Sequence, residues 1–244
     1  MGHCLMMRKG EVHTAPVTGV LASSLAVGST VKLMEDGTAV EYLVVNQGIP
    51  SNSNLYDASC DGTWLLRKDI HSNRKWHTSD ANKYETSAIN TWLNGTFFNS
   101  LGTTEQAVIK QVKLPYRKNG GYGGTDQSGA NGLSCKVFLL SGYEVGWTTS
   151  DYSYFPVDGA KLSYFESGTG TSANNKRIAN LNGSAADWWL RSPYANDTRY
   201  VWCVNSNGNC YGNRASNSNG IRPALVLPSN ALFDKTTKLL MGVK

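Results

Sequence analysis

The chain has 244 residues, of which 40% are apolar and 17% charged, so it can form one large domain or two small ones with a substantial core. The formal net charge is +5, but the lysines and arginines are scattered and no basic run is interleaved with aromatics. This pattern argues against nucleic-acid binding. No stretch approaches the roughly 18 apolar residues of a membrane span, so none is expected.

The N-terminal part is expected to be an ordered or half-ordered leader at 1–27, followed by the domain at 28–244. Residues 15–29 faintly resemble the apolar core of a signal peptide, but Pro, Gly, Thr and Ser dilute the stretch and no clear cleavage site follows, so it does not fit a secretion signal. Apolar residues then alternate around Asp36-Gly37, a dipeptide that favours a tight hairpin turn between two antiparallel strands. After a loop rich in Ser and Asn, 62–70 is expected to form a further short strand.

Helical spacing begins at 85–101, where Ile89, Trp92 and Leu93 form a core-facing stripe. Capping residues flank it: Thr86 or Ser87 at the start and Asn94-Gly95 at the end.

A second helix is expected from Thr103, which forms a capping box with Gln106 and places Ala107 and Val108 on the inner side. The glycine-rich loop at 115–134 follows a helix and precedes a strand, which is the wrong order for a phosphate-binding loop. A buried strand is expected at 135–145, connections at 154–165 and 173–183, and short aromatic strands at 187–193, 199–205 and 220–227. These elements indicate an α+β fold with helices gathered on one side of antiparallel sheets.

No motif for catalysis or metal binding is recognisable. The histidines (His3, His13, His71 and His77) have no metal-ligand spacing, and His71 and His77 are expected to lie exposed in a loop. The cysteines (Cys4, Cys60, Cys135, Cys203 and Cys210) are odd in number and match no zinc pattern. We therefore expect no enzyme activity, no metal and no cofactor.

The least regular stretch of the chain, from Tyr194 to Gly220, is rich in Asn, Gly and Ser and lies between the orderly WWLRSP and IRPALVL. One interpretation is a plain surface loop, because these residues favour turns. The other is a ligand-binding face, because Tyr and Arg supply contact area and hydrogen bonds while Ser, Gly and Asn adapt, as in antibody combining sites.

A coding argument favours the ligand-binding face. Randomising the adenines of Asn codons AAC reaches Tyr, Asp, Ser, Gly, Cys and Arg, but not Lys, Glu, Gln, Met or Trp. From Tyr194 to Asn219 the chain has no Lys, Glu, Gln or Met, and its single Trp202 lies in the apolar YVWCV. The residues that depart from Asn are all reachable, which explains both cysteines as chance outcomes: Tyr194, Asp197, Arg199, Tyr200, Cys203, Cys210, Tyr211, Gly212 and Arg214.

With these features the chain resembles the variable proteins of diversity-generating retroelements, which are found in phages and their bacterial hosts. The resemblance rests on WWLRSP, the Asn-rich window and GIRPALVL, with weaker support from CDGTWLL, INTWLN and CKVFLLS. Such retroelements copy a template repeat with adenine-specific errors into the 3′ end of a target gene. The resemblance extends over most of the chain after about Gly28.

The resemblance implies a C-type lectin-like fold, with two helices packed on short antiparallel sheets with long loops. It implies a variable region at about 194–214 that binds a protein or cell-surface ligand, on a phage virion or a bacterial cell surface. The calcium-dependent sugar motifs of true C-type lectins are absent, and both trimers and monomers occur in the family. The implied ligand-binding residues are Tyr194, Asn196, Asp197, Arg199, Tyr200, Cys203, Asn205, Asn207, Asn209, Cys210, Tyr211, Gly212, Asn213 and Arg214.

A fixed scaffold is expected around the window. Trp188, Trp189 and Trp202 anchor the sheet beneath it, and Arg191 and Arg222 hold loops through backbone carbonyls or carboxylates.

Two alternatives stay open at this point. One is an oxidase of the formylglycine-generating type on the same fold, which would need Cys203 and Cys210 as a pair. The other is a structural tail or decoration domain of a virion.

Overall fold

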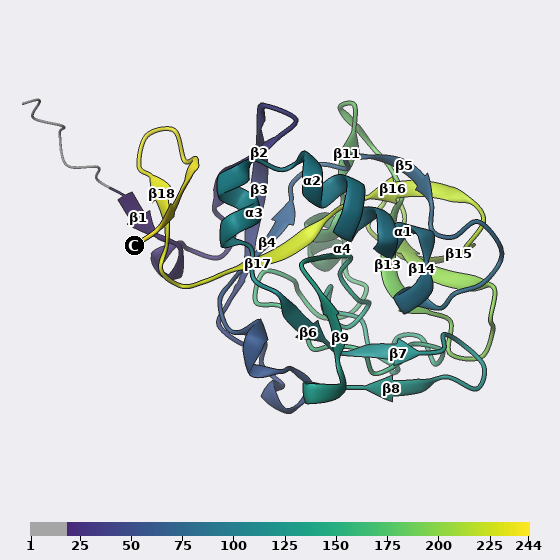
Figure 1. The fold of residues 1–244 in the computed structure, drawn as a ribbon. Coiled ribbons are helices and arrows are strands. Elements are labelled where there is room, and N and C mark those ends of the chain that lie inside the picture. Colours follow the sequence, from purple (N-terminus) through teal and green to yellow (C-terminus); the bar gives the residue numbers. More distant parts are fainter. Residues whose placement is uncertain (1–18) are drawn as a thin grey trace, which may run out of the picture.

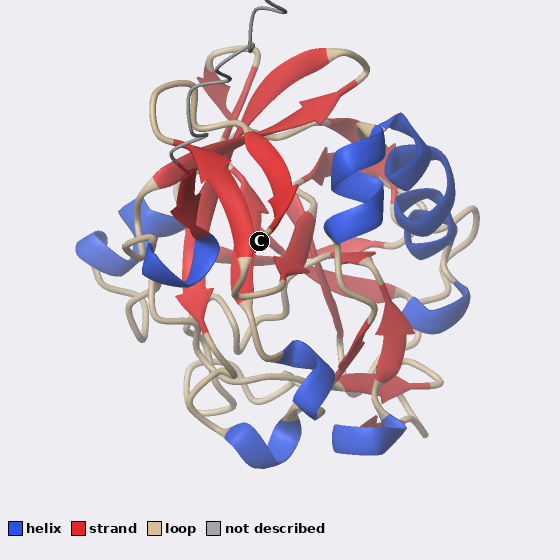
Figure 2. Cartoon of the chain, turned by 60° about the vertical axis from the view of Figure 1, so that its left-hand side comes forward, coloured by secondary structure: helices blue, strands red, loops and turns tan. Residues whose placement is uncertain are grey.

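The computed structural model describes residues 19–244; His3, Cys4, His13 and the first part of the expected leader lie outside this range. Strands form the centre of the molecule and short helices lie at its periphery (Figures 1 and 2). The fold is therefore α+β, as expected, but it is mostly β.

The first large sheet has the strand order β10-β17-β4-β3-β2, with every pair antiparallel. The expected hairpin is confirmed: Asp36 and Gly37 have φ angles of 45° and 76°, the left-handed conformations that a tight two-residue turn requires. The strands are β2 (Thr30–Glu35), β3 (Thr38–Gln47), β4 (Thr63–Arg67), β10 (Val137–Phe138) and β17 (Ala224–Leu227).

The second large sheet has the order β15-β14-β13-β16-β5. Its one parallel pair joins β13 to β16, where Trp188 lies opposite Gly220; its other pairs are antiparallel. The expected strand at 220–227 is divided between the two sheets by Arg222-Pro223. The strands are β5 (Ser72–Lys75), β13 (Trp188–Pro193), β14 (Tyr200–Val204), β15 (Cys210–Arg214) and β16 (Ser218–Ile221).

The inner strands of both large sheets are buried on both faces. Along β3, Tyr42 and Val44 face one apolar cluster while Leu43 and Val45 face the other. The same division holds across β4, β13, β14 and β17. Strands that are covered on both sides read as continuous apolar runs, which explains YLVV, ALVL and YVWCV.

Smaller sheets complete the fold. They are β1-β18-β19 (Gly19–Leu21, Ala231–Asp234, Leu240–Val243), β6-β9 (Val112–Leu114, Leu133–Cys135), β7-β8 (Tyr116–Lys118, Thr125–Gln127) and β11-β12 (Asn180–Leu181, Ser184–Ala185). Strand β1 pairs with β18, Ala22 is fully buried, and Gln47 donates to the carbonyls of Ala22 and Leu25. Residues 19–27 therefore pack on the domain, although the sequence placed them in the leader.

The first expected helix consists of three consecutive pieces. Ser87 caps it by accepting from the N–H of Asn90, as expected. The chain does not end the helix at Asn94-Gly95, because the Asn94 side chain bonds the backbone of Val137 and the helix continues through a π-helical turn. The pieces are α1 (Ala88–Trp92), the π-helical segment Leu93–Phe97 and α2 (Phe98–Ser100).

The second expected helix, α3 (Thr103–Val108), differs from its prediction in detail. Gly102 is its N-cap and no capping box forms. Ala107 is exposed, whereas Glu105 is buried and accepts from the N–H of Met34 at 2.9 Å. This buried carboxylate sets which face of the short helix turns inward.

Another helix, α4 (Thr171–Arg177), lies in a stretch expected to be a connection. Single 3₁₀ turns occur at Ala22–Ser24, Ser53–Leu55, Ala58–Cys60, Tyr84–Thr86 and Gly129–Asn131.

Candidate functional site

The polar window, residues 194–214, lies on the β14–β15 hairpin at one edge of the second sheet. Its turn is built by two residues: the Asn205 side chain accepts from the backbone of Asn207 and Asn209, and Gly208 has φ of 76°. A Cβ at Gly208 would lie 2.1 Å from the carbonyl oxygen of Asn174. Asn205 and Gly208 are therefore needed to form the turn itself, whether or not they also contact a ligand.

Most of the predicted contact residues reach the surface. Tyr211 is 48% exposed, and Asn196, Arg199 and Asn207 are also exposed. The others are half-buried: Tyr194, Asp197, Tyr200, Asn205, Asn209, Cys210, Gly212, Asn213 and Arg214.

Cys203 is the exception, because it is fully buried in the core. Because side chains alternate along a strand, Cys203 points into the apolar cluster that also contains Tyr42 and Val44. Its thiol donates to the carbonyl of Tyr211 at 3.1 Å. The prediction that Cys203 contacts a ligand is therefore wrong for this fold.

Strand register also divides the window between two faces. Tyr211 pairs with Cys203 and shares its face, whereas Gly212 pairs with Trp202 and lies on the opposite face. The expected single contact surface is therefore two neighbouring surfaces, which meet at the edge strand β15.

The face that includes Gly212 carries a stack of aromatic rings. Tyr194 lies on Trp202 at a centroid distance of 3.8 Å, and Trp202 lies on Phe155 at 4.4 Å. Tyr154 stacks beside Tyr194 at 6.3 Å and is 46% exposed. A groove of about 260 Å³ opens here, lined by Tyr154, Tyr194, Asn196, Asp197, Tyr200 and Gly212.

Charged side chains flank this groove. Arg199 pairs with Asp197 at 2.8 Å, and Arg214 pairs with Asp80 at 2.6 Å. Both guanidinium groups lie 5.6 Å from the ring centre of Tyr200. Hydrogen bonds from Arg199 lower the pKa of Asp197, and bonds from Ser216 and Arg214 lower the pKa of Asp80, so both carboxylates stay ionised at neutral pH.

Residues outside the window complete the site, and the sequence interpretation missed them. Asp80 bonds Arg214, Tyr154 forms one wall of the groove, and Asn82 donates to the carbonyls of Asp197 and Tyr200 at 2.7 Å. Glycine in the 115–134 loop permits a close approach here, because a Cβ on Gly121 would lie 1.9 Å from the carbonyl oxygen of Asp197. The run of glycines was the one signal that some backbone packs closely against this loop.

The tryptophan scaffold is buried as expected. Trp188 and Trp189 are fully buried, and Trp202 is 4% exposed. Each indole N–H donates to a carbonyl in another part of the chain: Trp188 to Arg177, Trp189 to Arg74 and Trp202 to Tyr154.

Arg191 lies beneath the window and holds several loops together. Its guanidinium makes two bonds of 2.6 Å to the Glu144 carboxylate and also donates to the carbonyls of Pro115, Leu139 and Asp158. Arg191 and Glu144 are both almost fully buried. The expected role in holding loops is confirmed.

Arg222 has a similar role at the point where the chain passes between sheets. It donates to the carbonyls of Arg67 and Lys68 and lies 5.0 Å from the ring centre of Trp188.

The cysteines and histidines of the described residues form no pair or metal cluster. Cys60, Cys135, Cys203 and Cys210 are free, and burial raises the pKa of Cys60 to about 11 and of Cys135 to about 12. Within 19–244 no group of three or more His, Cys, Asp or Glu could hold a metal ion. His71 and His77 are half-buried, not exposed as expected.

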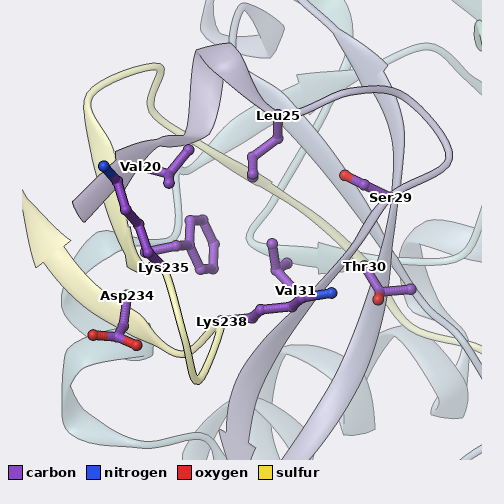
Figure 3. A pocket seen from close by; sticks show the side chains of 9 residues that line it. Val20, Leu25, Ser29, Thr30, Val31, Asp234, Lys235 and Lys238 are labelled. Atoms are coloured by element: carbon purple, nitrogen blue, oxygen red, sulfur yellow. The ribbon is translucent and has the colours of Figure 1, made fainter. Parts of the chain in front are cut away.

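A small cavity of about 160 Å³ lies at the far end of the molecule, between β1, β2 and β18 (Figure 3). Val20, Leu25 and Val31 point into it, while the Asp234 carboxylate points away. It is smaller than typical ligand pockets, which occupy roughly 300–1,000 Å³. We therefore do not assign it a ligand.

Among the described residues, no helix is long and apolar enough to cross a membrane. Neither the curated proteins nor the solved structures yield a match to this chain. Residues 61–229, from β4 to just beyond β17, match a family described as "Domain of unknown function (DUF6273)". This match includes both scaffold segments and the window between them. The chain belongs to the DUF6273 family.

Proposed function

We propose that this protein binds a ligand through the window, and that the window is diversified by adenine-directed mutagenesis on a C-type lectin-like scaffold. The ligand is a protein or another cell-surface molecule, and the protein that binds it is displayed on a phage virion or a bacterial cell surface. In this proposal the chain is a receptor-binding protein or adhesin and not an enzyme. Assembly into a homo-oligomer would multiply the contacts.

One observation carries the proposal: the framework is buried, whereas exposed side chains of the window project from the hairpin at the edge of the sheet. Trp188, Trp189, Arg191 and Arg222 are buried and bonded to backbone atoms elsewhere. Tyr211 and Arg199 project from the edge hairpin that this framework holds. Such a hairpin tolerates substitution because the core does not depend on its exposed side chains.

The cysteine positions favour binding over an oxidase. The register turns Cys203 and Cys210 to opposite faces of the hairpin, and burial raises the pKa of both thiols well above the ordinary range. Catalytic thiols are instead partly exposed and have lowered pKa values.

A binding array of bacterial surface proteins and glycans, probed with this variant, tests the function. On the ligand found, Tyr211→Ala and Arg199→Ala should each weaken binding by about 2 kcal/mol, roughly thirtyfold, because Tyr and Arg dominate interface energies. Lys75→Ala, an exposed cation at the opposite edge of the sheet, is the control and should bind normally.

Unchanged affinity in both window variants would contradict the proposed surface. The retroelement origin has its own test in the gene neighbourhood. It requires a near-identical repeat with AAC codons and a reverse transcriptase, and their absence would refute it.

A further inference from the structure

A second cavity lies at the other edge of the same sheet, beside β5. It has a volume of about 380 Å³, within the range of small-molecule sites, and we call it the Arg74 cavity. The hairpin turn at Asp36, strand β5, α1, the π-helical segment and α2 form its walls. The Asp36 turn and the end of α2 are adjacent, since the Asp36 N–H donates to the carbonyl of Ser100 at 2.8 Å (Figure 1).

The guanidinium group of Arg74 is oriented by an aromatic ring but has no hydrogen-bond acceptor among the described residues. Its guanidinium carbon lies 4.2 Å from the ring centre of Trp92, a stacked position that orients the planar group. Among the arginines in 19–244, Arg74 is the one whose guanidinium has neither an ion pair nor a hydrogen bond within the structure. Its donors are therefore available to a planar acceptor such as a carboxylate.

Asp36 contributes an unpaired charge of the opposite sign to the same cavity. Its carboxylate has no ion pair or hydrogen bond to any described side chain, and it lies more than 4.0 Å from Arg74, the limit for an ion pair. A cation and an anion thus line one cavity without neutralising each other. This arrangement is complementary to a ligand that carries both charges.

The rest of the lining is mixed, with the rings of His71, Trp92 and Phe97 beside the polar Thr96, Asn99 and Ser100. His71 contacts Trp92 and Phe97 edge to face at 5.3 and 5.4 Å. Burial and the nearby Arg67 lower the pKa of His71, so it adds no charge at neutral pH. Phe97 belongs to the π-helical segment, and such distortions of a helix are frequent at functional sites.

We propose that the Arg74 cavity binds a free α-amino acid. Arg74 holds its carboxylate, Asp36 holds its ammonium group, and Trp92 contacts its side chain. Phosphate fits less well, because Asp36 repels a dianion. An amino acid is a zwitterion with no net charge, and its ammonium group attracts Asp36. The site is separate from the window, which lies on β15 at the opposite edge of the sheet.

Titration calorimetry with the whole protein tests this. The twenty natural amino acids are ranked first by thermal shift, and L-phenylalanine is then compared with 3-phenylpropionate and 2-phenylethylamine, which each lack one charge. Each analogue should bind at least tenfold more weakly than L-phenylalanine. Arg74→Gln should weaken L-phenylalanine at least tenfold, and Asp36→Asn should weaken L-phenylalanine but not 3-phenylpropionate.

Lys75→Gln, which removes an exposed charge from the same strand, is the matched control and should leave the affinity unchanged. Asn tolerates the positive φ of residue 36, so Asp36→Asn should keep the hairpin, and circular dichroism checks this. Equal binding of 3-phenylpropionate and L-phenylalanine would overturn the zwitterion assignment. Absence of saturable binding by any amino acid would overturn the site.

Discussion

At the scale of single residues, the ring of Tyr194 occupies the position that a side chain at residue 212 would need. A Cβ at Gly212 would lie 2.2 Å from the Tyr194 hydroxyl oxygen and 2.5 Å from its ring. We expect Gly212→Ala to displace Tyr194 from Trp202 and to lower the free energy of unfolding by about 1–3 kcal/mol, as overpacking does. Urea denaturation measures this loss.

A double-mutant cycle assigns the effect to this contact. In a Tyr194→Ala background, Gly212→Ala should lose most of its cost, since the clashing ring is gone. Gly95→Ala is the control, because a Cβ there meets nothing within 4 Å and lies in a helix. An equal cost of Gly212→Ala in both backgrounds would contradict this steric explanation.

Asp158 provides a prediction for pH. Burial raises the pKa of this carboxyl to about 7, although Arg191 and Ser192 favour its ionised form. The folded protein therefore holds the proton more tightly than the unfolded chain does. The resulting stability is fully present below about pH 4 and is lost as pH rises through about 7, a change on the order of 4 kcal/mol.

Unfolding measured from pH 4 to pH 8 tests this, and Asp158→Asn should flatten the curve in that window. Asp80 is the contrasting control, because its pKa is lowered. Its contribution is present above the unfolded pKa and is lost as pH falls, so Asp80→Asn should alter the acid side of the curve. An unchanged slope in Asp158→Asn would refute the assignment.

Residue types were enough to predict the scaffold. Buried Trp188 and loop-holding Arg191 follow from aromatic size and from the donor geometry of a guanidinium group. Asp80 and Tyr154 could not be found this way, because Arg214 and Tyr194 meet them only after the chain has folded. Cys203 was misassigned because the coding argument ignores which face of a strand a residue occupies.

At the scale of elements, Arg191 joins strand β13 to the segments around Pro115, Leu139 and Asp158. Arg191→Met should lower the free energy of unfolding by about 3–5 kcal/mol, since it leaves the Glu144 carboxylate buried without its partner. Lys68→Met breaks the exposed pair with Glu41 and should cost less than about 1 kcal/mol. Similar losses in the two variants would argue against a special role for the buried pair.

Elements with strong local signals were predicted well. The Asp36-Gly37 turn and the Ser87 cap depend on neighbours in the sequence. The continuation of the helix past Asn94 could not be predicted locally, because it depends on a hydrogen bond to Val137 in another strand. The short α4 was missed for the same reason: its Arg177 is fixed by carbonyls of Val145, Glu166 and Gly168.

At the scale of the whole molecule, the family match covers less of the chain than the packed structure does. The match begins at residue 61 and omits β2 and β3, which are strands of the first large sheet. We expect a fragment of residues 61–229 to remain unfolded, because β4 would lose the strand that covers one edge and both apolar clusters would be opened. Residues 19–244 should fold, as judged by amide dispersion in NMR spectra.

A fragment of residues 28–244 is the intermediate case. It lacks β1 and the buried Ala22 and should fold with reduced stability. Equal stability of the 28–244 and 19–244 fragments would show that β1 contributes nothing. A cooperatively folded 61–229 fragment would show that the first sheet does not need β2 and β3.

The class of the fold was predictable from the sequence, but its layering was not. Alternating patterns reveal a strand with one buried face, as in β2. Strands such as β13 and β17, which are buried on both faces, lose that alternation. Nothing local then indicates which apolar cluster a side chain enters.

The parallel pairing of β13 with β16 has a further consequence. Trp188 lies opposite Gly220, and the Gly220 N–H donates to the carbonyl of Asp187, so β16 is joined to the start of β13 while β14 and β15, which lie between them in the sequence, form the other side of the sheet. The entropy cost of closing a loop between two fixed strands grows only slowly with the length of the loop. The connections at 194–199 and 215–217 can therefore gain or lose residues while the paired strands keep their places. Insertions and deletions, as well as substitutions, are open to this part of the protein.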